Sequence, residues 1–365
     1  MPTLTVAGAG MGGLVAAARA RELGVRPLVV EKGDRPGGSM LLSSCVIWRY
    51  RSFDEFRRQC PGGEPALQRL LHERLDGALD WLEGLGAPAL ERETGNRLTA
   101  GRRFDPRALT QALVRAAGPL RLGTPLGPGA VPPLVLATGG FPVALARRRG
   151  LLVRSNPWSD GDGLRFARRR GAAVAGALDE FYGRALPAPP ARVAELDYVR
   201  LAQLYGRFAL VLDEAGDEFG PDPVSWSEID LVQAIADRPG GRAWYVVDED
   251  TLGVGVRGRT VGAMVDAARA AGGTVLLAHE LPFELPGAYR YAVHVQAGVT
   301  HTLGGLQVDK RARVLRADGT PIAGLYAAGV DAGGFAAGGY ASGLAQALVL
   351  GLAAAETAAE ELSSP

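Results

Sequence analysis

The chain is poor in the residues that build metal centres and disulfide scaffolds. Its 365 residues include only two cysteines, Cys45 and Cys60, and four histidines. Neither cysteine has a partner at metal-ligand spacing, and two cysteines cannot form the framework of a small secreted protein. A haem-binding C-x-x-C-H motif is absent as well. These absences predict no metal site, no disulfide framework and a cytoplasmic location.

The sequence also lacks an excess of charge of either sign. Forty Lys and Arg residues stand against 39 Asp and Glu residues, which gives a net charge of +1. Nothing in this balance favours a nucleic acid or an anionic membrane as partner. The first predicted strand follows Met1 too closely for a signal peptide, and the longest apolar run, Leu344 to Ala355, is too short to span a bilayer.

The chain has ample apolar residues, at 47%, to fill two cores. Residues 3–8 and 26–32 are predicted strands around a predicted helix at 13–23, which together form a βαβ unit. A mostly helical stretch follows to residue 118, and 133–140 is a buried strand that ends on glycines. From about 179 to 300 the sequence becomes rich in aromatic residues and proline, which predicts a second module. Residues 304–330 predict a hairpin and a strand, followed by a loop and a last helix.

A phosphate-binding motif lies between the first predicted strand and helix. The stretch "VAGAGMGG" places Gly8, Gly10 and Gly13 in the G-x-G-x-x-G register. Glycines there permit a tight turn, a close approach to a pyrophosphate and the packing of the helix on the strand. Glu31 closes the second strand, where a carboxylate accepts the hydroxyls of an adenosine ribose.

A second stretch, "GVGVRG" at 253–258, fits the same pattern but does not follow a strand directly. It is therefore interpreted as a loop before a helix, and no separate NAD(P)H domain is expected.

Three later segments favour FAD over NAD as the ligand of the first motif. Bare backbone at "GDRPGGS" could run along the diphosphate, "LATGG" ends a strand at the same crevice, and "GLYAAGVDAGG" brings Asp331 to a strand end where an acid can hold ribitol hydroxyls. Each segment alone is also compatible with ordinary turn glycines of an α/β core. Their combination predicts FAD, with these binding residues: Gly8, Gly10, Gly13, Glu31, Lys32, Gly38, Ser39, Ala137, Thr138, Gly139, Asp162, Asp331, Ser342, Gly343 and Leu344.

With these motifs the chain resembles the FAD-dependent succinate dehydrogenase and fumarate reductase flavoprotein family, in its soluble, ketosteroid-dehydrogenase-like branch. The matching stretches include "VAGAGMGGLVAA", "EKGDRPGGS", "SDGDGLRFARRRGA" and "PIAGLYAAGVDAGG". The resemblance implies an α/β fold: a Rossmann-type FAD-binding domain in two segments, 1–178 and 301–365, with an inserted α+β capping domain at 179–300 that closes the substrate over the flavin.

The chain departs from the catalytic pattern of the fumarate reductases in that family. Where the resemblance implies two substrate-binding His residues, an acid-donating Arg and a substrate-gripping Arg, this chain has Thr300, Arg184, Glu228 and Tyr340. Fumarate reduction is therefore not expected. No His precedes His72, so a histidyl flavin linkage is not expected either, and the FAD should be noncovalent.

Two further features concern the ends of the FAD site. Ketosteroid dehydrogenases also have a Tyr in the last loop followed by a glycine, which Tyr340 and Gly343 resemble. Only "RLGTPLGPGAVPP" stands where relatives usually have a β-meander, so the adenine end of the site is expected to be more open.

The loop "AGGYASGLAQAL" joins the glycines to the last helix. Ser342 is a plausible cap for that helix, whose free amides and positive dipole end suit the negative charge that a reduced flavin carries. Tyr340 is then expected to reach over the flavin, where its hydroxyl can hydrogen-bond a substrate carbonyl. The alternative is that Tyr340 only packs between the two domains.

The other catalytic candidates are Tyr182, Arg184, Glu228 and His301. Glu228 could be an acid or a base, or instead a solvated helix residue. His301 could be catalytic, or it could serve only to position the backbone. Tyr198, Tyr205, Trp244 and Tyr245 are expected in the core of the capping domain.

Three functions fit these residues. The favoured one is an FAD-dependent oxidoreductase that desaturates a CH–CH bond beside a carbonyl of a small organic substrate. The second is an ene-reductase that receives electrons from a separate donor, and the third is a flavin-binding protein without turnover. The expected partners are a small-molecule substrate and a separate electron acceptor or donor, with no nucleic acid and no membrane.

Overall fold

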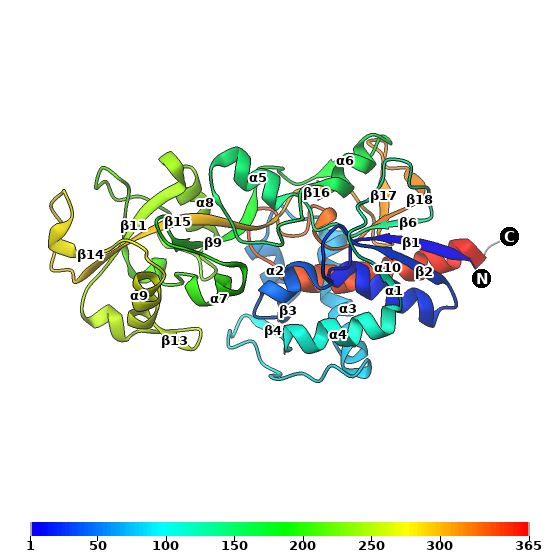
Figure 1. Ribbon diagram of the computed structural model, residues 1–365, viewed down its shortest axis with the longest axis horizontal. Coiled ribbons are helices and arrows are strands. Elements are labelled where there is room, and N and C mark those ends of the chain that lie inside the picture. The colour runs from blue at the N-terminus through cyan, green and yellow to red at the C-terminus, as the bar shows by residue number, and fades with distance from the viewer. Residues whose placement is uncertain (1, 364–365) are drawn as a thin grey trace. The chain divides into compact units, whose positions relative to one another are not determined.

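The computed structural model describes residues 2–363, which divide into two compact units (Figure 1). Of the described residues, the first unit takes 2–142, 156–180 and 301–363, and the second takes Val143–Ser155 and Phe181–Thr300. The fold is mixed α/β, as the sequence predicts.

The first unit is built on a six-stranded sheet in the order β17-β18-β6-β1-β2-β5. Five of the strands are parallel, and β17 joins the edge as the antiparallel half of a hairpin with β18. The order reverses between β2 and β6 on either side of β1, which is the switch point of a Rossmann-type sheet, where ligands bind outside the carboxyl ends of the strands. The strands are β1 (Thr3–Ala7), β2 (Arg26–Val30), β5 (Leu120–Arg121), β6 (Leu134–Leu136), β17 (Arg313–Leu315) and β18 (Pro321–Ala327).

Helices pack against this sheet, and α1 lies beside both β2 and α10 (Figure 1). The alanine-rich α1 can approach α10 closely because Gly351 of α10 has no side chain against the Gly12 carbonyl. Asp105 caps α4 by accepting hydrogen bonds from the N–H groups of Arg107 and Ala108, as expected for an acid at a helix start. The helices of this unit are α1 (Met11–Glu22), α2 (Phe53–Gln59), α3 (Pro65–Gly84), α4 (Pro106–Ala117), α6 (Asp162–Arg168) and α10 (Gly343–Ser363).

One small sheet interrupts the region that the sequence predicts as mostly helical. Strand β3 (Val46–Tyr50) pairs antiparallel with β4 (Thr99–Arg103), and α2 and α3 lie between them in the chain. A second small sheet pairs β8 (Val174–Ala175) with β16 (Gly305–Leu306). This second sheet joins the middle segment of the first unit, 156–180, to its last segment, which begins at His301.

The second unit contains a mixed sheet around the long strand β15 (Tyr291–Thr302), whose last two residues belong to the first unit. The main sheet order is β10-β11-β15-β14, and β7 and β9 also pair with β15. The expected core residues Tyr198, Tyr205, Trp244 and Tyr245 are buried. The other elements are α5 (Pro142–Arg149), β7 (Leu152–Val153), β9 (Phe181–Pro187), α7 (Tyr198–Leu201), β10 (Leu210–Leu212), α8 (Ile229–Ala236), β11 (Arg242–Val247), β12 (Gly255–Val256), β13 (Arg259–Thr260), α9 (Val261–Ala270) and β14 (Val275–Leu277).

The second glycine-rich stretch forms a short antiparallel hairpin of β12 and β13 ahead of α9. It does not follow a parallel strand, so it lacks the context of a dinucleotide-binding loop.

The chain leaves the first unit after Glu180 and re-enters it at His301, and these two points lie close together. The Leu303 N–H donates a hydrogen bond of 3.0 Å to the Glu180 carbonyl. Residues 143–155, which the sequence analysis placed with the FAD-binding segment, cluster with the second unit. Within residues 2–363, no helix combines the length and the apolar character needed to cross a membrane.

Candidate functional site

Gly8 and Gly10 lie in the turn between β1 and α1, and Gly13 lies in the first turn of α1. The three positions need glycine for different reasons. Gly8 has a left-handed φ of +106°, and a Cβ there would overlap the Ala137 carbonyl oxygen. A Cβ on Gly13 would overlap the Gly8 carbonyl, so this glycine lets the helix pack on the strand. A Cβ on Gly10 would have no neighbour closer than the Gly38 Cα, at 4.0 Å. Gly10 therefore leaves open space at the helix N-terminus, which is what a pyrophosphate needs.

Glu31 is buried beside this turn, directly after β2. One carboxylate oxygen accepts a hydrogen bond of 2.7 Å from the Ala9 N–H, and the other accepts one of 2.7 Å from the Gly33 N–H. Each oxygen keeps a further lone pair, so the carboxylate is oriented and can still accept a ribose hydroxyl. The predicted role of Glu31 fits this geometry.

Two side-chain contacts attach the residues after β2 to the start of α6 and to the segment before it. Lys32 forms an ion pair of 3.0 Å with Asp162, and the Ser39 hydroxyl accepts a hydrogen bond of 3.0 Å from the Asn156 N–H. Gly38 adopts a left-handed φ of +52° against Gly10. Asp162 and the Gly38 backbone thus lie in one loop cluster around the motif.

Asp331 occupies a different environment from the one expected of a ribitol ligand. It is 1% exposed, and each of its carboxylate oxygens accepts a hydrogen bond from a backbone N–H, one of Thr138 and one of Gly140. The Thr138 hydroxyl lies 2.9 Å from one oxygen and 3.0 Å from the other. The Asp331 carboxylate therefore ties the loop after β6 to the end of β18, and its contact with ribitol stays a prediction.

Replacing Asp331 by Asn should destabilise the first unit. The amide would turn its NH₂ group toward one of two backbone N–H donors, so a buried donor would lose its acceptor. We expect the free energy of unfolding to fall by about 1.5–3 kcal/mol in urea titrations. Asp318→Asn, in an exposed turn, is the control and should change stability little.

The loop 332–342 ends at α10, whose start gathers three predicted residues. The Ser342 hydroxyl accepts a hydrogen bond of 3.3 Å from the Ala345 N–H and caps the helix, as predicted. The His301 ring packs beside Gly343, where an added Cβ would lie 3.1 Å from its Cε1 atom. Tyr340 is half-buried two residues before the cap. The structure therefore brings Tyr340, His301 and the α10 N-terminus into one region of the first unit.

Tyr182, Arg184 and Glu228 lie together in the second unit. Tyr182 and Arg184 are buried on β9, with the guanidinium 5.0 Å from the centre of the Tyr182 ring, and Arg184 donates a hydrogen bond to the Ser227 carbonyl. Glu228 is 3% exposed at the start of α8, with a left-handed φ of +56°, and accepts a hydrogen bond of 3.3 Å from the Arg207 N–H. The solvated-helix alternative for Glu228 is therefore wrong.

Burial raises the pKa of Glu228 above its ordinary value of 4.5, and the nearby Arg184 guanidinium opposes the rise. Between the ordinary and raised pKa, the native state binds more protons than the unfolded state, so this group makes stability fall as the pH rises. Glu228→Gln removes that contribution. We expect the stability of the variant relative to the wild type to increase as the pH rises above about 4.5, by at most about 1.4 kcal/mol per pH unit, in urea titrations. A constant difference would contradict this.

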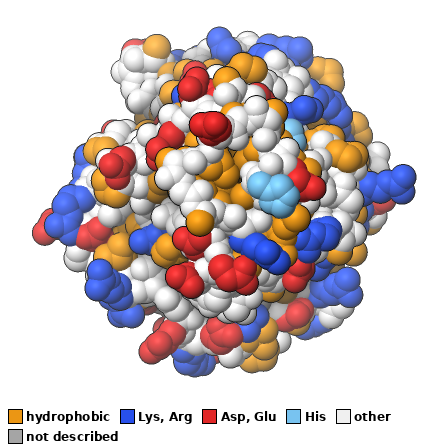
Figure 2. All heavy atoms as spheres, turned by 90° about the vertical axis from the view of Figure 1, so that its left-hand side faces the viewer, with side chains coloured by type: hydrophobic (Ala, Val, Ile, Leu, Met, Phe, Trp, Pro, Cys, Tyr) orange, Lys and Arg blue, Asp and Glu red, His pale blue; other side chains and the backbone are white. Residues whose placement is uncertain are grey.

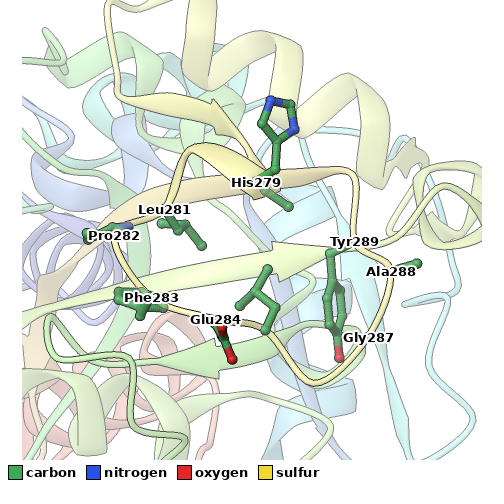
Figure 3. Close-up of a pocket in the computed structure, with 10 residues that line it drawn as sticks. His279, Leu281, Pro282, Phe283, Glu284, Gly287, Ala288 and Tyr289 are labelled. Carbon is green, nitrogen blue, oxygen red and sulfur yellow. The ribbon is translucent and has the colours of Figure 1, made fainter.

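A surface hollow of about 690 Å³ lies in the second unit between Ala278 and Tyr289 (Figure 3). Leu281, Phe283 and Leu285 contribute apolar side chains, and the His279 ring points away from them. Figure 2 shows this end of the second unit, with hydrophobic side chains among acidic and basic ones. No predicted site residue lines the hollow. Within residues 2–363, no three His, Cys, Asp or Glu side chains gather to hold a metal ion.

Sequence reasoning did not find Asn156, Trp48 or Tyr50. Asn156 bonds Ser39, while Trp48 and Tyr50 on β3 contact Tyr340. The only sequence signal was local: Asn156 precedes the "SDGDG" stretch, and Trp48 and Tyr50 alternate in a strand-like segment.

The glycine turn, the carboxylate after β2 and the sheet order define a Rossmann-type dinucleotide-binding protein. Two family models match the chain: an NAD(P)-binding Rossmann-like domain at residues 6–44, and an FAD binding domain at residues 130–343. The second match covers more than half of the 365 residues. The chain belongs to this FAD binding domain family, and its cofactor is FAD.

Curated relatives and solved structures agree with this family. A fumarate reductase (cytochrome) of Shewanella frigidimarina is 26% identical over 234 residues, which cover 53% of this chain but only 39% of that protein. A probable fumarate reductase of the same species, Ifc3, is 24% identical over 447 aligned residues, covering 97% of this chain and 74% of that protein. These matches confirm the resemblance to the fumarate reductase flavoproteins.

Among the solved structures that share the fold are a reductase and a dehydrogenase. One is the open conformation of a flavocytochrome c3 fumarate reductase, with a TM-score of 0.70 and 21% identity over 100% of this chain and 79% of that chain. The other is the 3-ketosteroid delta1-dehydrogenase of Sterolibacterium denitrificans, with a TM-score of 0.70 and 17% identity over 99% of both chains.

The residues of the site fit FAD bound without a covalent link. The earliest histidine is His72, and burial raises the pKa of the Cys45 and Cys60 thiols to about 12, which keeps them protonated and unreactive. We therefore expect acid precipitation to release all of the flavin as FAD, identified by chromatography of the supernatant. Colour retained in the pellet would contradict this expectation.

Proposed function

We propose that the chain is an FAD-dependent oxidoreductase that desaturates a CH–CH bond beside the carbonyl of a small organic substrate. The observation that carries this proposal is Tyr340, a half-buried phenol two residues before the Ser342 cap of α10. A phenol offers a hydrogen-bond donor without a positive charge. Such a donor is better suited to a substrate with a neutral carbonyl than to a substrate with a carboxylate. The fumarate reductases and the ketosteroid dehydrogenase with this fold support chemistry at a CH–CH bond.

In this reaction, a base removes the proton from the carbon next to the carbonyl, and a hydride leaves the neighbouring carbon as the double bond forms. FAD, when bound, supplies the acceptor for that hydride. The Tyr340 hydroxyl donates a hydrogen bond to the carbonyl oxygen, which gains negative charge as the proton leaves. His301, Tyr182 and Glu228 are the candidates for the base, and His301 lies with Tyr340 in the first unit.

The FAD site belongs to the same proposal. Gly10, Gly38 and the α1 N-terminus would hold the pyrophosphate, Glu31 the ribose, and the α10 N-terminus would offer its free N–H groups to the flavin. Residues 179–300 are proposed as the substrate domain. A separate acceptor is needed to remove the electrons.

Anaerobic mixing of the yellow protein with a panel of ketones, carboxylic acids and steroids tests the function. Bleaching of the flavin absorbance by a saturated carbonyl compound, with the unsaturated product found by mass spectrometry, is the expected result. Reoxidation of dithionite-reduced protein by the unsaturated compounds alone would favour the ene-reductase. No reaction in either direction would favour a flavin-binding protein without turnover.

A further inference from the structure

The backbone of Tyr340 is held by a side chain from another part of the first unit. Tyr50, on β3, is 1% exposed, and its hydroxyl donates a hydrogen bond of 2.6 Å to the Tyr340 carbonyl oxygen. This bond connects residues 290 positions apart in the sequence. It restrains the peptide plane that follows Tyr340 and so limits the backbone movement of the residue that carries this side chain.

The ring of Tyr340 also has an aromatic neighbour from the same strand. The Trp48 and Tyr340 ring centres are 5.2 Å apart at 64°, an edge-to-face contact. Trp48 and Tyr50 are two positions apart on β3 and therefore point to the same face, with ring centres 5.3 Å apart. Opposite Trp48, the bare Gly101 of β4 allows close pairing, because a Cβ there would lie 2.6 Å from the Trp48 Cα.

The loop before Tyr340 is attached at several further points. The Gly62 N–H donates a hydrogen bond of 3.1 Å to the Ala337 carbonyl, and the Gly338 N–H donates one of 2.6 Å to Glu180. Gly339 lies so close to the end of α2 that a Cβ would overlap the Gln59 carbonyl oxygen. With the loop backbone held in this way, the remaining choice is the rotamer of the Tyr340 ring.

We propose that Tyr50 and Trp48 are positioning residues for Tyr340. Tyr50 sets the direction of the Cα–Cβ bond, and the Trp48 ring selects the rotamer of Tyr340 that presents the hydroxyl to the substrate carbonyl. This proposal rests on the proposed function of Tyr340. A misplacement of about 1 Å can cost about 10²-fold in rate, so neither residue needs to touch the substrate in order to matter.

The test places 3-fluorotyrosine at position 340 of the FAD-loaded protein and records its ¹⁹F NMR spectrum without any substrate. The wild type should give one resonance. Tyr50→Phe, which removes only the hydroxyl, should shift that resonance or add a second one, whereas Tyr289→Phe in the second unit should leave it unchanged. If Tyr50→Phe does not fold, Trp48→Phe decides, because it replaces the indole that contacts Tyr340 but keeps an aromatic core residue.

An unchanged ¹⁹F resonance in each folded variant, Tyr50→Phe or Trp48→Phe, would overturn the proposal. With a compound that bleaches the flavin, Tyr50→Phe should lower the bleaching rate about tenfold with little change in the half-saturating concentration, since a positioning bond acts mainly in the transition state. A rise in half-saturating concentration alone would also overturn it. Because the NMR measurement needs no substrate, absence of bleaching would refute the proposed function while the NMR result still decides the positioning.

Discussion

Replacing Tyr340 by phenylalanine should slow flavin reduction by about 10²-fold or more while the FAD content of the protein stays normal. The substitution keeps the ring against Trp48 and the carbonyl that accepts the Tyr50 hydrogen bond, and removes only the hydroxyl. If that hydroxyl donates to a carbonyl that gains charge during the reaction, the lost bond costs more in the transition state than in the bound substrate. Anaerobic stopped-flow recording of flavin absorbance measures the effect.

Tyr289→Phe is the matched control for this experiment, since it removes a phenol hydroxyl from the surface hollow of the second unit. It should reduce at the wild-type rate. Unchanged kinetics in Tyr340→Phe would make Tyr340 a packing residue, and loss of FAD together with activity would make it a cofactor residue.

Gly10→Ala should remove most of the bound FAD and leave the fold intact. The added methyl group meets no protein atom closer than 4.0 Å, so the apoprotein can accommodate it, but it would occupy the space that the pyrophosphate needs. Overpacking of this kind costs about 1–3 kcal/mol, or about 5- to 150-fold in affinity. Titration of the apoprotein with FAD, followed by flavin fluorescence, gives the dissociation constant.

Alanine substitutions at two other glycines serve as controls for this experiment. Gly77→Ala lies in α3 with no atom within 4 Å of the added Cβ, so it should keep full FAD affinity and gain about 0.5–1 kcal/mol of stability. Gly13→Ala, whose Cβ would overlap the Gly8 carbonyl, should impair folding itself. Normal FAD affinity in Gly10→Ala would show that the phosphates lie elsewhere.

The features that the sequence predicted correctly depend on short-range geometry. The Gly8 to Gly13 turn, the Ser342 cap and the hairpin of β17 and β18 are each specified within a few residues, so motif and spacing suffice. The β3–β4 pair was missed because its strands are separated by α2 and α3, and helical periodicity dominates that region. No local pattern indicates a partner that far along the chain.

The functional side chains show the same limit. The sequence predicts Asp331 as a ligand at a strand end, which stays a prediction, but it does not indicate that the carboxylate also accepts hydrogen bonds from Thr138 and Gly140, 193 and 191 residues earlier in the chain. The sequence left open whether Glu228 is a solvent-exposed helix residue, yet tertiary packing buries it at the start of α8. Burial and long-range hydrogen bonds decide whether a polar residue serves the fold or the ligand, and the sequence contains neither directly.

The hydrogen bond between Glu180 and Leu303 has a consequence for the modularity of the chain. Because these residues are adjacent in space, residues 181–300 form an insertion whose two ends lie next to each other in the first unit. A segment with adjoining ends can change in length, or be exchanged for another, without moving the strands that carry the glycine turn and Asp331. If this segment binds the substrate, as we propose, substrate preference can change there while the residues of the glycine turn stay the same.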